Sequence, residues 1–445
     1  MRKSILITNA LIVNEGKTFE SDIRICSGRI DKIASSIVAS ETDKVLDAKG
    51  RWVLPGMIDD QVHFREPGLT AKGNLTSESA AAVAGGITSF MDMPNVNPAT
   101  TTIDALNKKY DIARDRCHAN YAFYLGATND NVDEIRALRP GQACGIKVFM
   151  GASTGSMLVD NEKTLHSIFK DAQVLVATHC EDTPTILANE KLARERFGDD
   201  VPMIEHPLIR SEEACYKSSS KAVQLALEYG TRLHVLHLTT ERELELFKPG
   251  PGLGKRITAE ACVHHLFYSQ DDYAELDTKI KCNPAIKKTS DRDALIQAVI
   301  DGRIDVIATD HAPHTEAEKA GNYFQVLAGL PLVQFALLMV LEHVQRGRFS
   351  IELATEKTSH AVADLFGIPD RGYIREGYWA DLVIIDPAKP TKVRREDILY
   401  KCGWSPLEGY EFSSSIFATL VNGEIVWGAD GATKQALGKP LIFQS

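Results

Sequence analysis

The middle of the chain alternates between short apolar runs and longer amphipathic stretches. Apolar runs bounded by turn residues are typical of buried strands, whereas apolar positions that recur every three or four residues are typical of helices. The stretches predict helices at 103–116, 183–197, 217–229, 291–301 and 332–345, and the runs predict strands at 53–63, 87–93, 121–126, 145–149, 174–179, 233–237, 256–259 and 304–310. Strands in alternation with helices predict a parallel sheet closed into a (β/α)₈ TIM barrel. An open doubly wound sheet is the alternative, but no G-x-G-x-x-G motif follows the first strand to favour its dinucleotide-binding form.

Both ends of the chain have a different pattern, that of short strands joined by turns. Strands are predicted at 5–13, 21–26 and 29–33, and again at 380–385, 416–421 and 424–427. The last two flank Asn422-Gly423, which suits a type I′ hairpin turn. We therefore expect a small β-sandwich domain built from residues 1–52 and 380–445 around a barrel of residues 53–379.

Composition narrows the class of protein. Apolar residues make up 44% and charged residues 25% of the chain, as in ordinary globular proteins, and the net charge of −10 argues against a nucleic-acid-binding surface. The eight cysteines are scattered and form no C-x-x-C pair, which is typical of reduced thiols in a cytoplasmic protein. No apolar stretch approaches the length of a membrane helix, and the N-terminal segment has no signal-peptide cleavage site. We expect a cytoplasmic protein without nucleic-acid or membrane partners.

Metal-binding residue types gather at the carboxyl ends of the predicted strands. In a (β/α)₈ barrel these ends share one face, so residues far apart in sequence converge there. Imidazole and carboxylate groups suit zinc or a similar divalent ion. A single strand histidine is usually a core residue, but a coincidence at five strand ends favours a site. The candidates are His63, Lys147, His179, His237 and Asp310.

Other histidines fit this pattern less well. His264 and His265 follow the seventh strand and are expected at most to support the ligands. His234 lies three residues before His237, so strand alternation predicts that it points to the other face.

Several segments together resemble the cyclic amidohydrolases, and the dihydroorotases most closely. They are Pro-Gly-Met-Ile-Asp at 55–59, His-Phe-Arg-Glu-Pro-Gly at 63–68, Ala-Gly-Gly-Ile-Thr at 84–88, Met-Pro-Asn at 93–95, Asn-Pro at 283–284 and Thr-Asp-His-Ala-Pro-His at 309–314. The resemblance covers nearly the whole chain. It implies a metal-dependent hydrolase that interconverts N-carbamoyl-L-aspartate and L-dihydroorotate plus water in pyrimidine (UMP) biosynthesis.

The resemblance also implies the metal ligands, for one or two Zn²⁺ ions per subunit. Those ligands are His63, Lys147, His179, His237 and Asp310, and Asp310 is in addition the catalytic proton carrier. An ammonium group has only donors and cannot bind a metal. The resemblance therefore implies that Lys147 reacts with carbon dioxide to give N6-carboxylysine, an anion able to bridge two ions.

One position departs from the family pattern. The family shows His-x-His after the first strand, whereas this chain has Gln61-Val62-His63. Gln61 shares a face with His63 by the two-residue period of a strand, but its amide is a weaker, neutral ligand. Gln61 is thus a metal-ligand candidate, and its presence supports an alternative: a non-catalytic dihydroorotase-like partner of aspartate carbamoyltransferase.

The substrate of a dihydroorotase carries a ring carboxylate, which allantoin and simple hydantoins lack. Arg65 lies on the same face as His63 and can bind a carboxylate through two hydrogen bonds; pairing with Glu66 or Asp60 is the alternative. The resemblance assigns Arg65, Asn95 and His314 to this carboxylate and Asn283 to the substrate ring. It assigns backbone contacts to Ala328 and Gly329, in a loop at 315–329. An allantoinase or hydantoinase is the alternative enzyme. A small-molecule substrate and a homo-oligomer are the expected partners.

Overall fold

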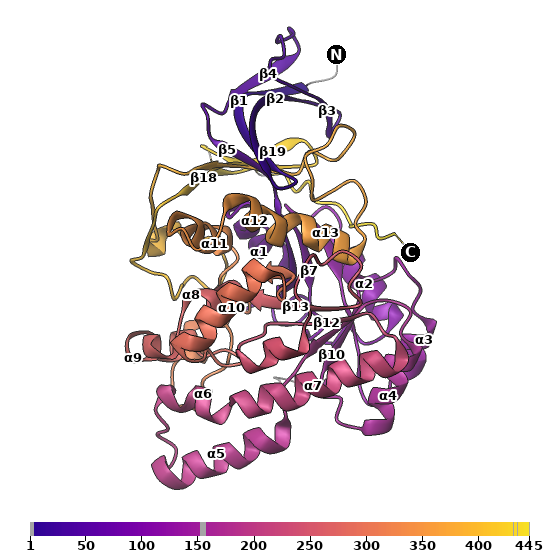
Figure 1. Cartoon of the computed structure of the whole chain (residues 1–445), viewed down its shortest axis with the longest axis vertical. Coiled ribbons are helices and arrows are strands. Elements are labelled where there is room, and N and C mark those ends of the chain that lie inside the picture. The colour runs from indigo at the N-terminus through magenta and orange to yellow at the C-terminus, as the bar shows by residue number, and fades with distance from the viewer. Residues whose placement is uncertain (1–3, 152–156, 430, 434, 445) are drawn as a thin grey trace.

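The computed structural model describes residues 4–151, 157–429, 431–433 and 435–444. Successive strands in the middle of the chain pair in parallel, and they close into a ring through a bridge between Val62 and His311. The predicted barrel is confirmed. Its strands are β6 (Met57–Val62), β7 (Ile87–Asp92), β8 (Asn120–Phe123) with β9 (Leu125–Gly126), β10 (Ile146–Phe149), β11 (Val176–His179), β12 (Leu233–Val235), β13 (Ile257–Cys262) and β14 (Val306–Ala308). In the lower part of Figure 1, strands such as β7, β10, β12 and β13 lie among the helices, and these strands belong to parallel sheets.

The helices surround this ring, and side-chain caps fix where several of them begin. Asp182 accepts a hydrogen bond from Thr185 N, so α5 begins where the sequence predicted. Ser211 caps α7 in the same way, which starts that helix five residues before the prediction. The helices are α1 (Leu75–Ala84), α2 (Ile103–Ala113), α3 (Val132–Ala137), α4 (Glu162–Asp171), α5 (Thr183–Phe197), α6 (His206–Ile209), α7 (Glu212–Tyr229), α8 (Val263–Phe267), α9 (Tyr273–Leu276), α10 (Thr289–Asp301), α11 (Ala336–Gln345), α12 (Ile351–Thr355) and α13 (Ala361–Phe366).

The two ends of the chain meet in a second sheet, at the top of Figure 1. Its strands run in the order β20-β19-β18-β15-β5-β1-β2-β3, and β4 also pairs with β1. Ile7, Ile12, Leu382 and Leu420 contribute to a separate apolar core there. The strands are β1 (Ser4–Asn14), β2 (Lys17–Cys26), β3 (Arg29–Ala34), β4 (Asp43–Asp47), β5 (Trp52–Pro55), β15 (Leu382–Asp386), β18 (Ser415–Val421), β19 (Glu424–Gly428) and β20 (Gly431–Ala432).

The apolar run at 53–63 forms two strands, not the single one predicted. β5 pairs with β1 and β15 in the second sheet, and β6 opens the barrel. Gly56 lies between them, where a Cβ would sit 2.1 Å from Thr88 Cγ2. The chain therefore passes from one sheet to the other at a point that only glycine fits, and an unbroken apolar pattern does not reveal such a passage. Within the described residues, no helix is long and apolar enough to cross a membrane.

Candidate active site

A cavity opens at the carboxyl ends of the barrel strands and brings together most of the predicted site residues. Because the strands are parallel, their last side chains meet on one face of the barrel. His314 lies beside this cavity and lines an adjoining one together with Arg65 and Asn95. The lining residues of the first cavity are Gln61, His63, Arg65, Asn95, Lys147, Phe149, His179, His237, Asn283, Asp310, Ala312, Ala328 and Gly329.

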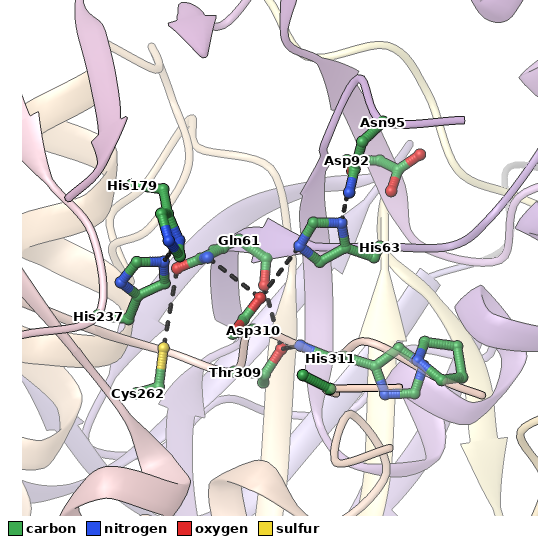
Figure 2. Close-up of polar contacts among 12 residues, drawn as sticks. Gln61, His63, Asp92, Asn95, His179, His237, Cys262, Thr309, Asp310 and His311 are labelled. Atoms are coloured by element: carbon green, nitrogen blue, oxygen red, sulfur yellow. Dashed lines mark hydrogen bonds and ion pairs between the residues drawn. The ribbon is translucent and has the colours of Figure 1, made fainter. Parts of the chain in front are cut away.

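His63, Asp310 and Gln61 form one hydrogen-bonded group in this cavity (Figure 2). The Nδ1 of His63 lies 2.7 Å from Asn95 Oδ1, and its Nε2 lies 3.0 Å from Asp310 Oδ1. Gln61 Nε2 donates to the same Asp310 oxygen at 3.1 Å, and Gln61 Oε1 accepts from Cys262 Sγ at 3.8 Å. Burial raises the pKa of Asp310, but the hydrogen bond and charge of His63 outweigh burial and lower it. Asp310 is therefore held as a carboxylate.

His179 and His237 form a second group across the cavity. Nδ1 of His179 lies 3.0 Å from Nε2 of His237 (Figure 2), and the Nε2 of His179 lies 3.0 Å from Glu181 Oε2. Glu181 is fully buried and also pairs with Arg210. The Glu181 carboxylate accepts a hydrogen bond from Nε2 of His179, so the lone pair of the neutral ring is on Nδ1, in the cavity. Many histidine metal ligands are oriented by a carboxylate in this way.

Lys147 lies on β10 and lines the cavity with 1% of its surface exposed. Its Nζ lies 4.6 Å from the centre of the Phe149 ring. Burial lowers the pKa of the Lys147 ammonium to about 8. A larger share of the amine is thus neutral than for a surface lysine, and the neutral amine is the form that reacts with carbon dioxide.

Arg65, His314 and Lys72 lie together beside the candidate ligands, and Lys72 is paired with Glu318 at 2.8 Å. Lys72 Nζ donates to Nδ1 of His314 at 3.2 Å, so the ring hydrogen is on Nε2, which lies 3.0 Å from Ala328 O. Arg65 approaches the same Nε2 at 3.3 Å. Burial and the two neighbouring cations hold the pKa of His314 far below its usual value. Because Glu318 balances the charge of Lys72, the guanidinium of Arg65 is the group here that can bind an anion.

Arg65 does not form either of the alternative ion pairs considered from the sequence. Glu66 pairs with Arg116 at 2.9 Å, and Asp60 lies 3.3 Å from His234. Arg65 is 5% exposed and is one of the residues that line the cavity.

Asn95, Asn283 and the backbone at 328–329 complete the walls. Asn95 uses its oxygen for His63, which leaves its amide hydrogens for a ligand. Asn283 Oδ1 is buried without a hydrogen-bond partner among the described residues. A Cβ at Gly329 would lie 2.4 Å from the carbonyl oxygen of Ala312, so the loop packs this closely only with glycine there.

The donor set in the cavity fits a divalent metal ion. His63 donates its Nδ1 hydrogen to Asn95, so its Nε2, beside the Asp310 carboxylate, is the atom that can either carry a shared proton or bind a cation. Burial lowers the pKa of His63, which favours the neutral ring. In the neutral ring, the Nε2 lone pair and the Asp310 carboxylate could both bind one metal ion. His237 Nδ1 is likewise buried without a hydrogen-bond partner in the described part of the chain.

Sequence reasoning missed Glu181, Arg210 and Lys72. Glu181 lies two residues after His179, so the strand period offered a signal for it. Arg210 and Lys72 are distant in sequence from the residues that they contact, and no pattern marks them.

The other histidines considered from the sequence, His234, His264 and His265, are not among the residues that line the cavity. The prediction that His234 points away is wrong: it lies inside the barrel, 3.3 Å from Asp60 Oδ2 and 3.7 Å from Glu260 Oε2. The strand ends at Val235, and His237 has a φ of 41°, so alternation does not extend from one histidine to the other. His264 and His265 are also buried.

Comparisons with known proteins agree with this geometry. A sequence profile described as "Amidohydrolase family" matches residues 52–426. The chain is 35% identical to a dihydroorotase of Halobacterium salinarum, with 92% of this chain and 94% of that one covered. It is 30% identical to an allantoinase of Bacillus velezensis, with 98% and 96% covered.

A solved structure has the same fold along the whole chain. It is the L-hydantoinase (dihydropyrimidinase) of Arthrobacter aurescens, 26% identical, with a TM-score of 0.92 and 99% of this chain and 100% of that one covered. The chain belongs to the amidohydrolase family and is a metal-dependent hydrolase of cyclic amides.

Proposed function

We propose that this enzyme is a dihydroorotase, which interconverts L-dihydroorotate and N-carbamoyl-L-aspartate in pyrimidine biosynthesis. The observation that carries the proposal is the buried Arg65, which forms no ion pair among the described residues and lines the cavity beside the candidate metal ligands. A ring carboxylate placed there meets a guanidinium and the free amide hydrogens of Asn95. The chain's 35% identity to a dihydroorotase supports the same assignment.

Zinc is the metal that we propose, held by His63, Lys147, His179, His237 and Asp310, with Lys147 carboxylated. When bound, such an ion polarises the amide carbonyl and lowers the pKa of water. Gln61 is the weakest candidate, because its Nε2 is directed at Asp310. We further propose that the protein is cytoplasmic and that it forms a homo-oligomer; light scattering of the purified protein would test the oligomeric state.

The chain's own groups account for the positioning and for the proton. Arg65 and Asn95 hold the ring carboxylate, so the amide carbonyl faces the histidines and Asp310. Asp310 Oδ1 takes a proton from the attacking water as the C–O bond forms. It returns the proton to the ring nitrogen as the C–N bond breaks. In the reverse direction the nitrogen attacks the side-chain carboxyl carbon and water leaves.

An allantoinase or hydantoinase is the second candidate, because such proteins are also similar to this chain. The deciding experiment assays the zinc-supplemented protein with dihydroorotate, N-carbamoyl-L-aspartate, allantoin and hydantoin, with metal analysis of the same sample. Turnover of the first two, abolished by a chelator, supports the proposal. Turnover of allantoin or hydantoin alone overturns it.

A further inference from the structure

A second cluster of possible metal ligands lies inside the barrel, apart from the candidate active site. Asp60 on β6, His234 on β12 and Glu260 on β13 are each 0% exposed, and one ligand atom from each lies within 4.8 Å of the others. β14 separates β13 from β6, so these side chains meet across the barrel interior. None of the three lines the catalytic cavity.

The orientation of His234 is fixed by Thr258. The Thr258 hydroxyl donates to Leu233 O at 3.2 Å, so its oxygen accepts the Nδ1 hydrogen of His234 at 2.8 Å. A neutral His234 therefore turns the lone pair of Nε2 toward Asp60 Oδ2 and Glu260 Oε2, at 3.3 and 3.7 Å. Three sets of lone pairs converge on one point, and only a cation or a proton there relieves their repulsion.

The carboxylates have little other compensation. Both oxygens of Asp60 and Oε2 of Glu260 are buried without a hydrogen-bond partner among the described residues. The other oxygen of Glu260 accepts from the backbone nitrogen of His237 at 3.0 Å and from Cys262 Sγ at 3.3 Å. Buried carboxylates of this kind are costly unless they are paired or bind a metal. A single proton on His234 leaves two carboxylates facing one imidazolium, whereas a divalent ion balances both.

We propose that Asp60, His234 and Glu260 bind one divalent cation, zinc or a close analogue, as a site distinct from the catalytic one. In a tetrahedral zinc site with bonds of about 2.0–2.1 Å, neighbouring ligand atoms lie roughly 3.3–3.4 Å apart. The separations of 3.3 and 3.7 Å are close to that spacing. One imidazole nitrogen with two carboxylate oxygens suits zinc, and Thr258 supplies the hydrogen bond that orients a metal-binding histidine.

An ion bound in this cluster would also affect the candidate active site, through Glu260. Glu260 contacts the cluster through Oε2 and the backbone of His237 through Oε1. An ion bound by Glu260 would therefore hold the carboxylate that accepts the hydrogen bond from the backbone of His237. Because all three ligands are fully buried, we expect the ion to enter during folding and to resist chelators that strip the open cavity.

The test separates this ion from the catalytic one by removing catalytic ligands. The background variant His63→Ala/His179→Ala, expressed with zinc, is expected to retain about one zinc per chain by mass spectrometry of the metal. Adding Asp60→Asn should reduce that to below about 0.1. The control is Asp59→Asn, since Asp59 is equally buried but is bonded to the hydroxyl and backbone of Thr309. It should leave the zinc count unchanged.

A second measurement uses the unmodified protein, in case a variant does not fold. Crystals of the zinc-grown protein are examined by anomalous diffraction at the zinc edge. A peak between Asp60, His234 and Glu260 supports the proposal. A peak in the catalytic cavity without one in the cluster overturns it, as does a folded background variant that contains no zinc.

Discussion

Gln61 donates a hydrogen bond from Nε2 to Asp310 Oδ1 at 3.1 Å, so its amide hydrogens are directed at the carboxylate. A histidine would offer a lone pair to a metal at this point, whereas the glutamine offers hydrogens to a carboxylate. We therefore expect Gln61 to hold Asp310 in place and to contribute little to metal binding.

Replacing Gln61 by histidine is expected to increase the zinc content by up to about one ion per chain, because an imidazole is the stronger ligand. Metal mass spectrometry of both proteins, prepared side by side, measures the difference. An unchanged zinc content in a folded variant would mean that Gln61 does not limit occupancy.

Asp310→Asn should lower kcat by roughly 10²–10⁴-fold, because the amide cannot accept the proton of the attacking water. The substitution is isosteric, so the fold is expected to persist, as circular dichroism would check. Turnover within a few-fold of the wild type would remove Asp310 from the proton-transfer role.

Arg65→Met should raise KM for dihydroorotate by about 10- to 100-fold, through loss of a hydrogen bond to a charged group. Hydantoin has no ring carboxylate and provides the matched control: any turnover of it should change little. If KM for dihydroorotate is unaffected, the carboxylate binds elsewhere.

Glu181→Gln should weaken zinc binding by about 10- to 100-fold, because the carboxylate orients His179 and makes it more basic. Competition with a zinc chelator of known affinity measures the change. The matched control is Glu318→Gln, which alters a carboxylate that pairs with Lys72. Equal zinc affinity of Glu181→Gln and the wild type would contradict this role of Glu181.

Carboxylation of Lys147 is testable by carbon-13 NMR. Protein supplied with labelled bicarbonate and zinc should give a carbamate signal that Lys147→Met lacks, because the buried amine is the reactive group. The variant should also bind less zinc. A carbamate signal that persists in Lys147→Met would place the modification on another lysine.

The sequence by itself determined the barrel, the strand ends at which candidate ligands lie, and the β-rich ends that pair in one sheet. These features follow from local periodicity and from the rule that parallel strands present their carboxyl ends on one face. His63, Asp310, His179 and His237 were found in this way, because each lies at or just after the end of a barrel strand.

Only the tertiary structure decided which groups meet across the barrel. The passage from β5 to β6 at Gly56, the pairing of Glu181 with Arg210, and the contact of Lys72 with His314 depend on packing between distant segments. The cluster of Asp60, His234 and Glu260 shows the limit most plainly. Strand alternation directed His234 away from the interior, but the turn at His237 breaks the alternation, and three-dimensional closure of the barrel brings the three side chains together.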